Sequence, residues 1–236
     1  MNLFWLLLLA HLIGDFPLQT DRVFYVKKMI KGGLWLHVGI WSLCNLVFTI
    51  PYLKYPLYWF IFLALVISHY IYDYSKIKLT EIGIADNFPL FILDQVLHIS
   101  TAFAAALFFY YLYPQIDGSS FGIWSRLDYI QPLSGFVFIV FAITPMNYFI
   151  INDYYAYFKG LKRPHWQFPS VAERKWGYIE RACIAIGIFL QSWYLIIIPL
   201  GILMRFIFGE KSDLREFWLS IGLTIASVWL LTVLIS

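Results

Sequence analysis

The chain has 236 residues, of which 61% are hydrophobic and only 13% are charged. Soluble domains carry about half apolar and about a quarter charged residues, so this composition predicts an integral membrane protein and excludes a disordered chain. The formal net charge of +3 is small and scattered along the sequence. Without a basic stripe, we expect membrane lipids as partners and no nucleic acid.

Seven apolar segments are long enough to cross a hydrocarbon core of about 30 Å, which takes roughly 20 helical residues. They cover residues 2–26, 33–53, 56–78, 88–113, 130–157, 178–204 and 214–236. Pro17 lacks the amide that would bond to the carbonyl of Ile13, which predicts a kink or break beside Asp15 in the first segment. We therefore expect an all-α, polytopic bundle of about seven transmembrane helices. It forms a single domain, 1–236, in which 1–113 make two similar hairpins and 114–236 add three helices.

The distribution of basic residues predicts the orientation of this bundle. With the N-terminus outside, 12 of the 17 Lys and Arg residues fall in connections on the cytoplasmic side. Short cytoplasmic loops are enriched in these residues. The sequence therefore predicts an N-terminus outside and a C-terminus in the cytoplasm.

Seven ionisable side chains interrupt the first four apolar segments, and they are His11, Asp15, His37, His69, Asp73, Asp94 and His98. In three segments a His and an Asp are four residues apart, so both lie on one helix face. Such groups are costly in lipid unless they face the bundle interior with a partner. Because successive helices alternate in direction, all seven fall at one depth near the cytoplasmic helix ends. We expect one polar pocket that opens to the cytoplasmic leaflet.

A faint internal repeat relates the first and third segments. The six residues from His11 align with the six from His69 with three identities, and His37 and His98 follow after 26 and 29 residues. Parallel repeats place paired ligands around a pseudo-two-fold axis at their interface. The repeat therefore favours a shared site between two hairpins.

Four imidazoles and three carboxylates at one depth are suitable ligands for one to three divalent metal ions. Zinc is the metal we expect first and manganese second, because both accept neutral imidazole and carboxylate ligands. Two other interpretations stay open, namely hydrogen-bonded structural His–Asp pairs and a chain that conducts protons. In a mixed arrangement, the histidines bind metal and some aspartates orient them.

Several residues are also candidate catalytic groups. Asp15 or Asp94 could accept a proton from a metal-bound water. Lys76 could hold a substrate phosphate, although a lysine near a helix end also follows from the positive-inside rule. Glu180 and Arg181 could act as a general base and an anion clamp, or could form a buried ion pair.

Five motifs resemble those of a bacterial family of small polytopic membrane proteins, catalogued only as domain of unknown function 3307. They are HLIGDFPLQ from His11 to Gln19, KG at 31–32 before His37, HxxxDxxK from His69 to Lys76, DQxxH from Asp94 to His98, and GxxER from Gly177 to Arg181. The resemblance implies that these positions form a unit in the bacterial inner membrane, but it implies no reaction. His-x-x-x-Asp pairs on helices are also similar to those of zinc-dependent phospholipase C and of some membrane-bound metal-dependent hydrolases.

The leading hypothesis is a metal-dependent hydrolase that cleaves a lipid-linked or membrane-inserted phosphoester from the cytoplasmic leaflet. One metal would lower the pKa of a bound water toward about 7, and a second would neutralise phosphate oxygens. The alternatives are a proton or metal-ion transporter that uses the cluster as a relay, and a non-catalytic scaffold or sensor. A transporter needs polar residues that continue to the outer face, and the sequence offers few beyond Ser42, Asn45 and Thr49.

Overall fold

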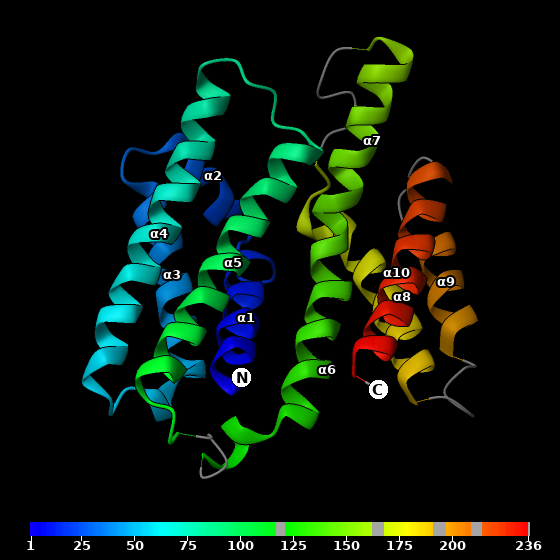
Figure 1. Cartoon of the computed structure of the whole chain (residues 1–236). Helices are drawn as coiled ribbons and strands as arrows, with labels where there is room; N and C mark the ends of the chain where they lie inside the picture. The colour runs from blue at the N-terminus through cyan, green and yellow to red at the C-terminus, as the bar shows by residue number, and fades with distance from the viewer. Residues whose placement is uncertain (117–120, 162–167, 191–196, 209–213, 236) are drawn as a thin grey trace. The chain divides into compact units, whose positions relative to one another are not determined.

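The computed structural model of the chain describes residues 1–116, 121–161, 168–190, 197–208 and 214–235. Every regular element within these ranges is a helix, so the predicted all-α class is confirmed for them (Figure 1). The chain divides into two compact units, Met1–Ser134 and Gly135–Ser236. The first unit includes both predicted hairpins.

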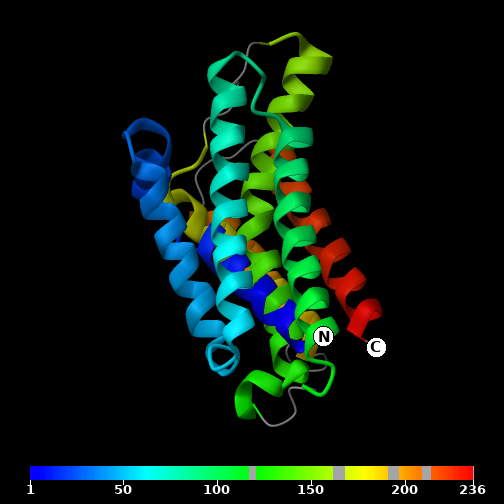
Figure 2. The same ribbon diagram turned by 60° about the vertical axis from the view of Figure 1, so that its left-hand side comes forward.

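A ring of four helices forms the first unit. They are α1 (Asn2–Asp15), α3 (Gly33–Phe48), α4 (Pro56–Glu81) and α5 (Phe88–Leu112). Helix α1 packs against α3 and α5, and α4 packs against the same two helices. Figures 1 and 2 both show α4 and α5 running side by side. The short 3-10 helices η1 (Ile50–Tyr52) and η2 (Gly122–Ser125) and the start of α6 (Leu127–Val137) complete the unit.

The first predicted span consists of two helices. Helix α1 ends at Asp15, and α2 (Asp21–Met29) begins after Thr20, whose hydroxyl accepts a hydrogen bond from the amide of Val23. This is a normal N-cap, so the sequence itself specifies a new helix start after Pro17. The predicted break beside Asp15 is confirmed, and the single segment 2–26 is replaced by α1 and α2.

Four helical segments of the described chain are long and apolar enough to cross a membrane. They are Pro56–Glu81, Phe88–Leu112, Leu127–Lys159 and Arg215–Val233. Helices α1 and α3 are apolar but shorter. Membrane character therefore follows from length and composition, whereas the predicted number of seven spans is not confirmed.

The second unit contains the end of α6, the π-helical turn η3 (Phe138–Ala142), α7 (Ile143–Lys159), α8 (Val171–Leu190), α9 (Ile197–Phe208) and α10 (Leu214–Ile235). Ile139, Ile143, Ala185 and Val228 form a buried apolar core. The predicted single span 178–204 is wrong, because α8 and α9 are separate helices that pack against each other. Gly201 allows this close approach, since a Cβ there would lie 2.5 Å from the Cβ of Cys183. The predicted orientation of the termini was based on seven crossings and stays a prediction.

Candidate metal centre

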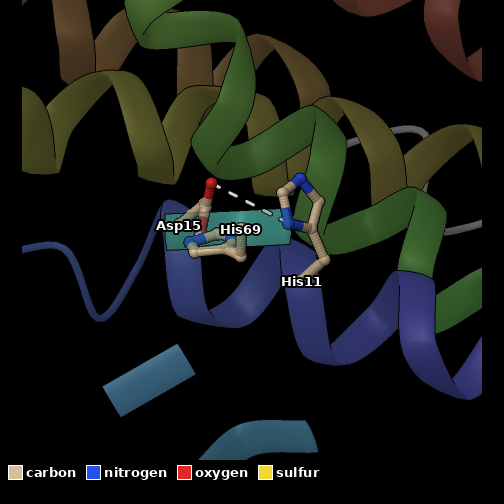
Figure 3. A group of neighbouring side chains, drawn as sticks. All are labelled: His11, Asp15 and His69. Carbon is tan, nitrogen blue, oxygen red and sulfur yellow. Dashed lines mark ion pairs between the residues drawn. The ribbon is translucent and has the colours of Figure 1, made fainter. Parts of the chain in front are cut away.

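The seven predicted metal ligands come from the four helices of the ring. They are His11 and Asp15 on α1, His37 on α3, His69 and Asp73 on α4, and Asp94 and His98 on α5. Each is at most 7% exposed. Figure 3 shows His11 and Asp15 one turn apart on α1, with His69 of α4 beside them. The spacing of four residues therefore places the side chains as the sequence predicted.

Four ligand atoms from three helices approach a common point. The Nε2 atoms of His37 and His69 are hydrogen-bonded to each other at 3.2 Å. Oδ2 of Asp73 lies 3.2 Å from Nε2 of His37 and 3.4 Å from Nε2 of His69. Oδ1 of Asp15 is 3.6 Å from each of these nitrogens. Ligands about 2.0–2.2 Å from a tetrahedral zinc ion are themselves about 3.3–3.6 Å apart, so these five pairs of atoms have about the spacing of a zinc site.

The two carboxylate oxygens at this point lack hydrogen bonds. Within the described residues, neither Oδ1 of Asp15 nor Oδ2 of Asp73 accepts one, although both are buried. An ionised carboxylate is expensive to bury without compensation. A cation among the four atoms would supply the missing interaction, which is why the donor set fits a metal ion.

The two histidines of this group are held by packing. The Nδ1 atoms of His37 and His69 have no hydrogen-bond partner within the described chain, unlike most metal-bound histidines. The ring of His69 is stacked on the indole of Trp41, with centroids 4.2 Å apart. Trp41 was missed by the sequence analysis. The available signal was its position four residues after His37, on the same helix face.

Lys27 on α2 is a second residue that the sequence analysis missed. Its Nζ donates to Oδ1 of Asp73 at 2.8 Å and to Oε1 of Gln19 at 3.3 Å. Burial alone lowers the pKa of Lys27, but the carboxylates of Asp73 and Asp15 outweigh that effect and raise the pKa above its ordinary value. The positive-inside rule had already explained this lysine, so nothing in the sequence pointed to a contact with the cluster.

Asp94 and His98 form a second part of the cluster on α5. Lys76 and the Gln95 amide both donate to Oδ2 of Asp94, each at 3.2 Å. Nδ1 of His98 is 2.7 Å from the backbone carbonyl of Asp94, which can only accept, so Nδ1 carries the proton. Lys76 therefore lies beside a predicted ligand, as expected for a residue of the site.

His11 differs from the other three histidines of the cluster because both of its ring nitrogens have hydrogen-bond partners. The indole N–H of Trp41 donates to Nδ1 at 3.2 Å. Nε2 therefore carries the proton, and it lies 3.3 Å from Oε1 of Gln95. Ligand atoms of His11, Asp15 and His69 also lie within 4.8 Å of one another. The role of His11 as a metal ligand stays a prediction, because metal binding through Nδ1 would break its hydrogen bond with Trp41.

The comparisons with known proteins concern this same unit. Residues 3–119 match the family model described as Protein of unknown function (DUF3307). This region, which is just under half of the chain, resembles that family. The DUF3307 region contains all seven predicted ligands together with Lys27 and Lys76. No curated protein and no solved structure matches the chain. The resemblance is thus confirmed, and a location in the bacterial inner membrane stays a prediction.

Glu180 and Arg181 lie outside the DUF3307 region, in the second unit. Glu180 forms an ion pair with Arg205 at 2.5 Å and accepts a hydrogen bond from Ser220 at 3.3 Å. The guanidinium of Arg181 donates to Ser220 and to the carbonyl of Val140, at 3.1 and 3.0 Å. These partners belong to the second unit, and Glu180 forms its buried ion pair with Arg205, whereas the sequence analysis had paired it with Arg181. Their predicted catalytic role stays a prediction.

Proposed function

We propose that the protein is a membrane-embedded, metal-dependent hydrolase that acts on a lipid-linked or membrane-inserted phosphoester from the cytoplasmic leaflet. A zinc ion, with manganese as second choice, is held by Asp15, His37, His69 and Asp73. The observation that supports this most is that five of the six pairs among their four ligand atoms are 3.2–3.6 Å apart. Two of the four are buried carboxylate oxygens without a hydrogen bond in the described chain.

Structural His–Asp pairs explain the cluster less well. Such a pair needs an imidazole N–H within about 3.2 Å of its own aspartate. Nδ1 of His11 is 3.8 Å from Asp15, and Nδ1 of His98 is 3.8 Å from Asp94. In these two i, i+4 pairs the side chains share a face without bonding to each other, whereas Asp73 lies 3.4 Å from His69 and 3.2 Å from His37. A cation between the helices accounts for the arrangement better.

The charge of the cluster supports a phosphate substrate. Asp15, Asp73 and Asp94 face two lysines, Lys27 and Lys76, each of which contacts an aspartate. With neutral imidazoles, the carboxylates exceed the ammonium groups by one, so a single divalent ion makes the site positive. Metal bound in the cluster would activate water and neutralise phosphate oxygens, and Lys76 would bind a further oxygen. A site among apolar helices suits a substrate that arrives from lipid.

The test is hydrolysis by the purified protein in proteoliposomes that contain a panel of phospholipids and polyprenyl phosphates. We expect release of phosphate or phospho-headgroup with Zn²⁺ or Mn²⁺, and its loss in Asp73→Asn. The matched control is Asp86→Asn, which removes a carboxylate that pairs with Lys28 outside the cluster. No turnover of any member of the panel by a metal-loaded wild type would contradict the proposal.

One observation favours transport as a second candidate. A small cavity with room for about one water molecule is lined by His11, His69 and His98 and extends toward Asn45. A relay would need side chains that exchange protons beyond this cavity. The Asn45 amide and the Thr49 hydroxyl instead donate to backbone carbonyls of their own helix. Metal-ion or proton flux in the same proteoliposomes, without hydrolysis, would select this candidate.

A further inference from the structure

We propose that the first unit binds a second divalent metal ion through Nε2 of His98, Oδ1 of Asp94 and a carboxylate oxygen of Asp73. This second ion, rather than the first, would hold the hydrolytic water. The inference rests on the proposed function and assigns separate roles to two groups of ligands. It is supported by Nε2 of His98 and Oδ1 of Asp94, which are not ligand atoms of the first ion.

His98 presents a lone pair that is ready for a metal. Its Nδ1–H donates to the backbone carbonyl of Asp94 at 2.7 Å, so in the neutral ring the lone pair is on Nε2. This bond is the usual way in which a protein fixes the tautomer of a metal-bound histidine. Within the described residues, Nε2 has no hydrogen-bond partner, and the side chain is only 3% exposed. A buried, unpaired lone pair of this kind needs a cation or a donor.

Asp94 is arranged in a similar way. Its Oδ2 accepts from Lys76 and from Gln95, each at 3.2 Å, which fixes the carboxylate. Its Oδ1 is buried and accepts no hydrogen bond from any described residue. One oxygen is therefore held in place while the other is left with an unused lone pair.

Asp73 connects the two groups of ligands. One ring nitrogen of His98 and one carboxylate oxygen each of Asp73 and Asp94 lie within 4.8 Å of one another, and so do one ligand atom each of His37, His69 and Asp73. The carboxylate of Asp73 thus belongs to both groups. Shared carboxylates of this type bridge the ions of two-metal hydrolases in general.

The number of protein ligands distinguishes the two positions. The first has four, which is the closed arrangement of structural zinc sites. The second has three, which leaves a position for water or a phosphate oxygen, as in catalytic zinc sites. In the hydrolysis, the water oxygen forms the new P–O bond and the P–O bond to the lipid alcohol breaks. One water proton ends on the alcohol and the other on the phosphate.

The experiment is equilibrium dialysis of chelator-treated protein in detergent against Co²⁺, with the bound ions counted per chain. We expect two ions in the wild type and one in both His98→Ala and Asp94→Asn. If His98→Ala does not fold, the isosteric variant Asp94→Asn tests the second metal position by itself. Asp86→Asn is the matched control, because it removes another carboxylate of the unit, one that pairs with Lys28 outside the cluster. It should retain two ions.

The outcomes separate this inference from the proposed function. One ion in the wild type that is unaffected by Asp94→Asn but lost in His37→Ala would overturn the second position and leave the first intact. No bound Co²⁺ in the wild type would overturn both. Loss of a single ion in His98→Ala, with the visible spectrum of the remaining tetrahedral Co²⁺ unchanged, would support the second position without any activity assay.

Discussion

The two units each bury a cluster of ionisable side chains, but they satisfy these groups in opposite ways. In the second unit, Arg205 bridges Glu180 and Glu216, and Arg181 donates to Ser220. Two arginines balance two glutamates. None of these side chains has a buried polar atom that lacks a partner within the described chain. The charged groups of this cluster therefore satisfy one another without an added ion.

The cluster of the first unit is incomplete by the same criteria. Its carboxylates exceed its lysines, and buried atoms of Asp15, Asp73, Asp94 and His98 have no hydrogen-bond partner in the described chain. The comparison teaches that burial of charged groups does not by itself mark a binding site, because structural networks are buried too. Unused lone pairs that converge on one point are the distinguishing feature.

Asp73→Asn should have the largest effect on metal binding, because Asp73 belongs to both groups of ligands. We expect loss of all tightly bound metal, measured by elemental analysis of folded protein that elutes as a single species. Asp86→Asn should keep the full metal content. A variant Asp73→Asn that still binds one ion at wild-type affinity would show that this carboxylate is not a ligand.

Glu180→Gln should mainly affect stability. Removal of one partner from a buried ion pair leaves the other charge uncompensated and costs about 3–5 kcal/mol. We expect a decrease of that size in the free energy of unfolding, measured by chemical denaturation in detergent, with unchanged metal content per folded chain. Metal loss at full stability would instead make Glu180 part of the metal site and would remove the contrast between the two units.

Trp41→Leu should weaken metal binding by about 10–100-fold, as loss of other groups that orient ligands does. The stacked indole positions His69, whose Nδ1 has no hydrogen bond in the described chain. Trp41→Phe keeps an aromatic ring at this position, so its affinity should stay within a few-fold of the wild type. Competition against a fluorescent zinc chelator measures both. Equal losses in the two variants would argue against positioning by stacking.

Substitution of one glycine in each unit should give the smallest effects. A Cβ on Gly14 would lie 3.0 Å from Cδ1 of Trp41, and a Cβ on Gly177 would lie 3.2 Å from Nη1 of Arg181. Overpacking of this kind costs about 1–3 kcal/mol, and we expect the lower end for both alanine variants. Only Gly14→Ala should also weaken metal binding, because Trp41 contacts His69. Thermal unfolding together with metal titration distinguishes the two.

The sequence was most informative where one local pattern decides the structure. The spacing of four residues and the common depth of His11, His69 and their aspartates were enough to predict that α1 and α4 present a polar face to the same region. Pro17 likewise predicted the end of α1. Hydropathy did not distinguish one long span from the pair α8 and α9, because both helices are apolar.

The contacts of Lys27 and Trp41 could not be predicted, because they depend on how helices from distant parts of the sequence pack. Lys27 reaches Asp73 across 46 positions, and Trp41 reaches His11 across 30. The difference between His11 and His98 in hydrogen bonding could not be predicted for the same reason. A lone pair used by an indole N–H and a lone pair left unused look identical in a sequence.

The most direct test is a crystal structure of the zinc-loaded protein with anomalous diffraction measured at the zinc absorption edge. The account predicts an anomalous peak about 2.0–2.2 Å from Oδ1 of Asp15, Nε2 of His37, Nε2 of His69 and Oδ2 of Asp73. No peak among these atoms, with the Nε2 atoms of His37 and His69 still hydrogen-bonded to each other, would contradict it.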